Sequence, residues 1–392
     1  MTIPLLDLAR QYNDIKEETD VAVFRALSKA SYIMGENVVA FEHEFANYVG
    51  VRHAISVGNG TDALVITLKA FGIGVGDEVI TTPYTFFATA EAISAVGATP
   101  VFVDVRLDTF NIDEDKIEEK ITDKTKAILP VHIFGQCAEM DKILNIAKKY
   151  NIAVIEDACQ AAGAEYRGKK AGSLGNASCF SFFPTKNLGC AGDGGMICTD
   201  DDDIATICRA LRVHGSGEMG ERAYNLLNSI TAEVEQDHAE DNTVYNPKKY
   251  YNYLIGHNSR LDELQAALLR IKLRKLDGYV EKRRAAAHYY NTHLPKSIIP
   301  PIEVDGNKHA YHLYIVQSEC RQEITLKLKE AGIATGIYYP VPVHLQKCYC
   351  DLGYIEGSLP NAEYLSQRTF ALPLFPEIFE KELEYITQIM EE

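Results

Sequence analysis

The sequence has no apolar run that approaches the ~20 residues of a membrane-spanning helix, so we expect no membrane association. Residues 1–7 show no basic region followed by an apolar core, and no signal peptide is therefore expected. The nine cysteines are an odd number and include no CxxC pair. This pattern favours reduced thiols in a cytoplasmic protein over a disulfide framework or a metal site.

Positive charge is also scarce, because 39 Lys and Arg residues face 55 Asp and Glu residues and leave a net charge of −16. This balance argues against a nucleic-acid partner. It does not exclude an anionic small ligand, since the N-terminus of a helix binds phosphate whatever the net charge of the protein. The 392 residues, 46% apolar and 24% charged, are typical of an ordinary globular protein of one or two domains.

The stretch around Lys186 carries the clearest chemical signal. The apolar run 177–183 predicts a short buried strand, which Pro184 ends because proline cannot donate to a sheet. A lysine placed just beyond such a strand can be partly desolvated, which lowers its pKa and makes it a nucleophile. Since most lysines are solvated surface charges, this interpretation needs support from a second motif.

The second motif is the strand predicted at residues 152–155, with Asp157 at its C-terminal end. Ligands of open α/β sheets bind at that end of the strands. A carboxylate and a lysine at two such ends are what a pyridoxal 5'-phosphate (PLP) site requires. The lysine binds the aldehyde, and the carboxylate keeps the pyridine nitrogen protonated so that the ring accepts electrons. Taken alone, Asp157 fits a helix N-cap equally well.

A third pattern is the strand 54–57, the turn 58–62 and the apolar helix 63–70. The free N–H groups at the start of such a helix can bind an anion, and Thr61 adds a hydroxyl. A plain β-to-α turn capped by Thr61 or Asp62 explains the same residues.

Short apolar strands alternate with helical segments over the first half of the chain, and this alternation predicts an α/β fold with a doubly wound, mostly parallel sheet. The further strands are expected at 79–87, 101–105, 127–131 and 196–199, with a helix at 139–150.

The second half of the chain contains a long polar segment at 215–252, which we expect to be a functional or mobile loop. A helix is expected from about residue 256, and we place there the boundary between a large domain, 1–255, and a smaller α+β domain, 256–392. Within the smaller domain, 309–314 is predicted to be a strand. His309 and His312 would then face opposite sides of it, so their HxxH spacing is a weak metal signal and no metal site is expected.

Five motifs together resemble a known family. They are GNGTDAL (58–64), PYTFFAT (83–89), EDACQ (156–160), FSFFPTKNLG (180–189) and GHNSRLDELQ (256–265). In this order they resemble the DegT/DnrJ/StrS family of PLP-dependent sugar-nucleotide aminotransferases. The resemblance implies the fold type I, aspartate aminotransferase-like architecture: a large domain with a mostly parallel central sheet flanked by helices, and a smaller α+β domain.

The resemblance assigns roles around the cofactor ring. Lys186 matches the Schiff-base lysine, and Asp157 matches the residue that faces the pyridine nitrogen. Gln160 matches the residue near the ring hydroxyl, and Phe86 matches the aromatic side chain that stacks on the ring.

The resemblance also assigns a cradle for the cofactor phosphate. It consists of Gly60, Thr61, the backbone of Asp62, and Ser181. Asn258 matches an asparagine that reaches the phosphate of the neighbouring subunit, and this match implies an obligate homodimer with shared active sites.

The activity implied by the resemblance is transfer of an amino group from L-glutamate, which leaves as 2-oxoglutarate, to a keto sugar linked to a nucleoside diphosphate. Residues 258–262 resemble members that act on 3-keto sugars, whereas 4-keto members more often have an aromatic residue where Ser259 stands. A 4-keto sugar aminotransferase is the alternative. A sugar dehydratase of the same fold is disfavoured by Lys186, since one such branch has histidine there. A regulatory protein of the same fold is disfavoured by the intact set of Lys186, Asp157 and Ser181.

Overall fold

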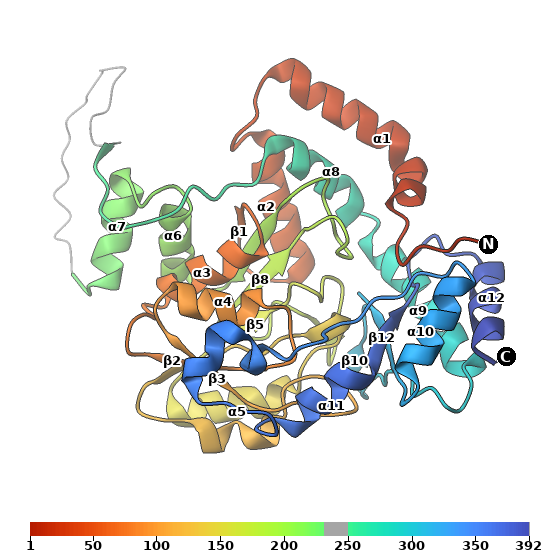
Figure 1. Ribbon diagram of the computed structural model, residues 1–392. Helices are drawn as coiled ribbons and strands as arrows, with labels where there is room; N and C mark the ends of the chain where they lie inside the picture. The colour runs from red at the N-terminus through yellow and green to blue at the C-terminus, as the bar shows by residue number, and fades with distance from the viewer. Residues whose placement is uncertain (231–249, 392) are drawn as a thin grey trace.

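The computed structural model describes residues 1–230 and 250–391, and at its centre lies a seven-stranded sheet (Figure 1). The strand order is β1-β9-β8-β5-β4-β2-β3. Neighbours from β8 to β3 are parallel, and β9 runs antiparallel to both of its neighbours. The predicted α/β class with a mostly parallel sheet is thereby confirmed. The strands are His53–Val57 (β1), Glu78–Thr81 (β2), Thr99–Phe102 (β3), Thr125–Ile128 (β4), Ala153–Asp157 (β5), Ala177–Ser181 (β8) and Gly195–Thr199 (β9).

Helices bury both faces of this sheet, because successive side chains of a strand point to opposite faces. In β8, Cys179 packs into the apolar cluster of α3 and α6, whereas Phe180 packs into the cluster of α2, α5 and α8. The sheet is therefore dry on both sides, and polar groups gather at the ends of its strands. These helices are Glu36–Val49 (α2), Gly60–Ala70 (α3), Ala88–Ala95 (α4), Met140–Tyr150 (α5), Asp202–Leu211 (α6) and Glu263–Leu273 (α8).

The N-terminal helix α1, Leu8–Lys29, lies along α8 at the upper edge of the molecule (Figure 1). Its N-cap is Asp7, whose carboxylate accepts hydrogen bonds from the first backbone N–H groups of the helix. Val21 and Phe24 are 69% and 72% exposed. Part of the apolar face of α1 is therefore uncovered.

The C-terminal part has a core of its own, formed by α9, α10, α12 and the antiparallel pair β11–β12, and Ile3 from the N-terminal segment packs into it. The predicted domain boundary near residue 256 stays a prediction. The elements are Leu276–His293 (α9), Asn307–Lys308 (β10), Tyr314–Gln317 (β11), Arg321–Glu330 (α10), Pro360–Arg368 (α11), Thr369–Leu372 (β12) and Glu380–Glu391 (α12).

Short elements complete the described residues. The small strand β10 pairs with β6, which in turn pairs with β7. They are Glu165–Tyr166 (β6) and Lys169–Lys170 (β7), with 3-10 helices at Glu114–Lys116 (η1), Glu118–Lys120 (η2), Ile133–Gly135 (η3), Val343–Leu345 (η5) and Lys347–Leu352 (η6).

The strand predicted at 309–314 is wrong, since β11 begins only at Tyr314. Ahead of it, the N–H of Ala310 donates to the carbonyl of Gly135, and the N–H of Tyr311 donates to Nδ1 of His309. Tyr311 also has a positive φ of 45°. Packing against Gly135 thus bends this segment out of the extended conformation that its apolar residues favour.

The loop predicted at 215–252 is wrong in its first part, because Gly217–Leu227 forms helix α7, which packs against α6. Ala223 is fully buried there, in the cluster that covers one face of the sheet. Residues 231–249 lie outside the described residues. The predicted helix from about 256 begins at Glu263, and the strand predicted at 101–105 lies two to three residues earlier, as β3.

All nine cysteines are free. Five are buried, Cys159 is half-buried, and Cys320, Cys348 and Cys350 are exposed. Burial raises the pKa of the inner thiols. None of the helices in residues 1–230 and 250–391 combines the length and apolar character that crossing a membrane requires.

Candidate active site

Two neighbouring strands end at the predicted site. Asp157 is the last residue of β5 and pairs with Cys179 of β8, which ends two residues later at Ser181. The Asp157 side chain is buried, at 4% exposure. Its Oδ2 accepts a hydrogen bond from Oγ1 of Thr89 at 2.8 Å, and its Oδ1 accepts one from the N–H of Cys159 at 3.2 Å. Because a carboxylate offers about four acceptor positions, Asp157 can still accept a hydrogen bond from a ligand.

Lys186 lies on a tight loop beyond β8. Its backbone N–H donates to the carbonyl of Phe183 at 2.9 Å. Two contacts clamp the loop: Nδ2 of Asn187 donates to the carbonyl of Ala310 at 2.8 Å, and Nζ of Lys272 donates to the carbonyl of Gly189 at 2.7 Å. The side chain of Lys186 is therefore carried by a loop that is held on both sides.

The surroundings of Lys186 favour the neutral amine. Burial lowers the pKa of Lys186, while the Cys159 thiol and the Asp157 carboxylate oppose this shift. Burial lowers the pKa of His312 as well, and the charge of Lys186 adds to this effect. The structure thus brings the predicted lysine and carboxylate within electrostatic reach of each other, and the effect of burial on the lysine outweighs that of the carboxylate.

The predicted phosphate cradle lies at the start of α3. Asn59 caps this helix by accepting a hydrogen bond from the N–H of Asp62 at 2.8 Å, and the first N–H groups of a helix have no partner inside it. A Cβ at Gly60 would lie 2.8 Å from Cβ of Ser181 and 3.1 Å from Sγ of Cys159. Only glycine lets the helix start approach β8 this closely, and free N–H groups and the Thr61 and Ser181 hydroxyls suit a phosphate.

Gln160 and Phe86 both lie near Tyr339. Oε1 of Gln160 accepts a hydrogen bond from the N–H of Phe134, and its Nε2 donates to the hydroxyl of Tyr339, both at 2.9 Å. Phe86 is 58% exposed, and its ring centroid lies 6.5 Å from that of Tyr339. Its predicted stacking stays a prediction.

Asn258 is exposed, while the next residue, Ser259, is buried. The two are held by an antiparallel bridge between Val213 and Asn258. The predicted contact of Asn258 with a neighbouring subunit stays a prediction.

Two polar residues of this region escaped the sequence reasoning. Thr89 belongs to the motif at 83–89, but only the fold shows that its hydroxyl reaches Asp157. Tyr339 comes from the C-terminal part and contacts Gln160 across 179 residues of chain. Its signal in the sequence was the pair of tyrosines at 338–339.

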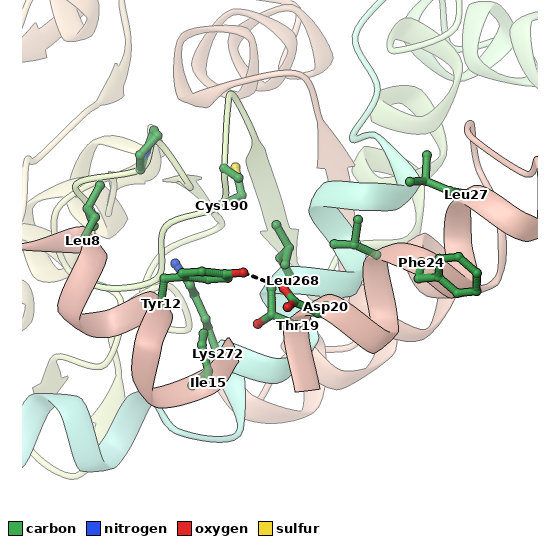
Figure 2. A pocket seen from close by; sticks show the side chains of 13 residues that line it. Leu8, Tyr12, Ile15, Thr19, Asp20, Phe24, Leu27, Cys190, Leu268 and Lys272 are labelled. Carbon is green, nitrogen blue, oxygen red and sulfur yellow. Dashed lines mark hydrogen bonds between the residues drawn. The ribbon is translucent and has the colours of Figure 1, made fainter. Parts of the chain in front are cut away.

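A cavity of about 710 Å³ lies away from the strand ends, between α1, α8 and the loop after β8 (Figure 2). Apolar side chains such as Leu8, Phe24 and Leu268 line most of it. It touches the loop of Lys186 only through its flanks, at Pro184 and at residues 190–191. None of the predicted site residues lines this cavity.

The residues at the strand ends fit PLP. A partly desolvated amine, a buried carboxylate with free acceptor positions and a helix N-terminus supplied with hydroxyls match its aldehyde, pyridine nitrogen and phosphate in turn. The fold and this set of residues define an aminotransferase with the type I architecture.

The chain belongs to the DegT/DnrJ/EryC1/StrS aminotransferase family, whose sequence model matches residues 13–391. It is 45% identical to a pleiotropic regulatory protein of Geobacillus stearothermophilus, over 99% of this chain and 97% of that protein. It is 42% identical to the dTDP-3-amino-3,6-dideoxy-alpha-D-galactopyranose transaminase of Aneurinibacillus thermoaerophilus, over 98% of each chain.

A crystal structure of DesV from S. venezuelae, in complex with a ketimine intermediate, is similar over 100% of this chain and 98% of that chain. The TM-score is 0.89 at 38% identity. These findings confirm the predicted family, fold and enzyme class.

Proposed function

We propose that this enzyme uses PLP to transfer the amino group of L-glutamate to C-3 of a keto sugar linked to a nucleoside diphosphate. The observation that carries the proposal is the placement of Lys186 and Asp157 at neighbouring strand ends beside the N-terminus of α3. Amination at C-3 is supported by the name of the Aneurinibacillus thermoaerophilus relative, which is a 3-amino-sugar transaminase.

The cofactor would be held by groups already described. Lys186 binds its aldehyde, Asp157 its pyridine nitrogen, and Gln160 lies near its ring hydroxyl, with Phe86 against the ring. The start of α3 and Ser181 hold its phosphate. When bound, PLP supplies an electron sink for the bond broken at the amino acid's Cα.

Lys186 would be released from the cofactor when the amino donor takes its place, and its free amine would then act as the base. Burial lowers the pKa of Lys186, which suits an amine that is to take the proton from Cα of the amino donor. The Asp157 carboxylate is held in place by Thr89 and the N–H of Cys159, and in this position it would face the pyridine nitrogen. In the transfer to the keto sugar, the same amine would carry a proton in the opposite direction, to the sugar carbon that receives the amino group.

We further propose a homodimer in which Asn258 reaches the neighbouring site, which its exposure at the start of a buried segment supports. The reaction would take place in the cytoplasm, since nine free cysteines fit a reducing compartment. A regulatory role is a second candidate, favoured by the name of the Geobacillus stearothermophilus relative.

The test combines Lys186→Ala with the control Lys124→Ala, which replaces an exposed lysine. Wild-type protein and the control should show a visible absorption band of bound cofactor that changes when L-glutamate is added, and both should aminate a 3-keto sugar nucleotide. The K186A variant should lose turnover entirely. Undiminished transamination by K186A would refute the assignment.

Two further outcomes separate the alternatives. Faster amination of the matched 4-keto sugar would transfer the assignment to C-4. A wild-type protein that remains colourless after PLP is supplied would leave the regulatory role.

A further inference from the structure

The hydroxyl of Ser259 joins the two ends of the turn that forms the phosphate cradle. The N–H of Gly58 donates to Ser259 Oγ at 2.8 Å, and Ser259 Oγ donates to Oδ2 of Asp62 at 2.6 Å. A hydroxyl has one hydrogen to donate and lone pairs to accept with, so both bonds are satisfied together. Ser259 is 1% exposed, and its hydroxyl is therefore committed to the protein.

The position of this hydroxyl is fixed independently of the cradle. The backbone N–H of Ser259 donates to the carbonyl of Arg212 at 3.0 Å, and that of His257 donates to the carbonyl of Leu211 at 2.6 Å. Arg212 is buried, and its Nη1 donates to the carbonyl of Ser56 in β1 at 2.8 Å. Ser259 thus connects the turn, through hydrogen bonds, to the end of α6 and to β1.

The Asp62 carboxylate gives this contact an electrostatic consequence. Asp62 lies in the first turn of α3, next to the N–H groups assigned to the phosphate. An unpaired carboxylate there would repel a phosphate dianion. The Ser259 hydrogen directs Oδ2 of Asp62 towards Gly58, where a Cβ would lie only 3.3 Å from that oxygen.

We propose that Ser259 is a positioning residue for the cofactor phosphate, which holds the Gly58–Asp62 turn in shape and turns the Asp62 carboxylate away from the phosphate. The proposal rests on the proposed function, because it requires that PLP binds at this turn.

The experiment measures the affinity of PLP for protein freed of cofactor, by titration of its visible band. Ser259→Ala should weaken PLP binding about 10- to 100-fold, the range expected for losing a hydrogen bond to a charged group. The matched control is Ser178→Ala, because Ser178 is also fully buried and donates one hydrogen bond, to the carbonyl of Gly172 at 2.8 Å. S178A should lose a comparable amount of thermal stability and keep the PLP affinity of the wild type.

Two more variants separate positioning from folding. Ser259→Cys keeps nearly the same volume with a weak donor, so it should also weaken PLP binding even if S259A is poorly folded. Adding Asp62→Asn to S259A removes the freed charge and should restore part of the affinity.

Each outcome decides one claim. Equal PLP affinities in S259A, S259C and S178A would overturn the positioning role while leaving the proposed function intact. A wild-type protein that binds no PLP would overturn both.

Discussion

Two consecutive residues of β5 carry buried carboxylates that differ in how many hydrogen bonds they accept. Glu156 accepts four hydrogen bonds: from Nε2 of His132 and from the backbone N–H groups of Gly172, Leu174 and Gly175, at 2.7–2.8 Å. All its acceptor positions are filled. Asp157, on the opposite face of the strand, accepts only two among the described residues. The Glu156 carboxylate therefore has no free acceptor position and holds a loop in place, whereas the Asp157 carboxylate can still accept a hydrogen bond from a ligand.

The two carboxylates also differ in the kind of hydrogen-bond donor that contacts them. The three backbone N–H groups around Glu156 can only donate. His132 must also donate through Nε2, because its Nδ1 accepts a hydrogen bond from the N–H of Ala138 at 3.2 Å. The hydroxyl of Thr89 can reverse, since it lies 2.9 Å from the hydroxyl of Thr85, to which it can donate instead. Burial alone therefore does not distinguish a structural carboxylate from a functional one, whereas the hydrogen-bond count and the kind of donor do.

The largest expected effect is on activity, from Asp157→Asn. In the proposed mechanism, the amide cannot supply the charge that would face the ring, and we expect transamination to fall about 10²- to 10³-fold, as for the loss of other fixed electrostatic groups. The melting temperature should hardly change, because Thr89 can accept from the new amide. Steady-state rates and a thermal melt of the same preparation test this. A large loss of stability in D157N would show that Asp157, like Glu156, has a structural role.

The second effect is on stability, from Glu156→Gln. An amide NH₂ would meet donors that cannot reverse, and we expect a loss of about 3 kcal/mol in the free energy of unfolding. The folded fraction should keep most of its specific activity. Urea denaturation of E156Q beside D157N gives the comparison directly. If E156Q loses activity and keeps its stability, the distinction between the two carboxylates fails.

The smallest expected effect is on the pH dependence of stability, and it comes from Lys186. The folded-state pKa of Lys186 is lowered, so the unfolded chain binds more protons in the interval between the two pKa values, and stability rises with pH there. In protein freed of cofactor, Lys186→Met should therefore be more stable than wild type near neutral pH, with a gain that shrinks as the pH approaches 10. In a D157N background, the gain in stability from Lys186→Met should be larger, because the Asp157 carboxylate no longer offsets the burial of the Lys186 charge. Thermal melts across pH measure this, and a pH-independent difference would contradict it.

The same pair shows what the sequence could predict. Asp157 could be predicted because its place at a strand end, together with Lys186, is a local pattern, and the five ordered motifs predict the remaining site residues. Three of the four partners of Glu156 come from a loop sixteen to nineteen residues further along the chain, and no local pattern indicates that this loop folds back onto the carboxylate.

The errors have the same origin. The strand expected at 309–314 is bent by the contact between Ala310 and Gly135, and α7 is a helix because Ala223 is buried against the sheet. Thr89 and Tyr339 were missed because their roles depend on side chains that meet only in the folded chain. Tertiary contacts decided each case, against a local preference or without any local signal.

The distribution of the cysteines has a practical consequence. Cys320, Cys348 and Cys350 are exposed, whereas the remaining six thiols are buried or half-buried, and burial raises their pKa. A maleimide dye at neutral pH should therefore react at three positions of the C-terminal part and spare Cys159 beside Lys186. The chain thus provides its own attachment points for fluorophores, with which movements around the cofactor site can be followed without introducing a cysteine.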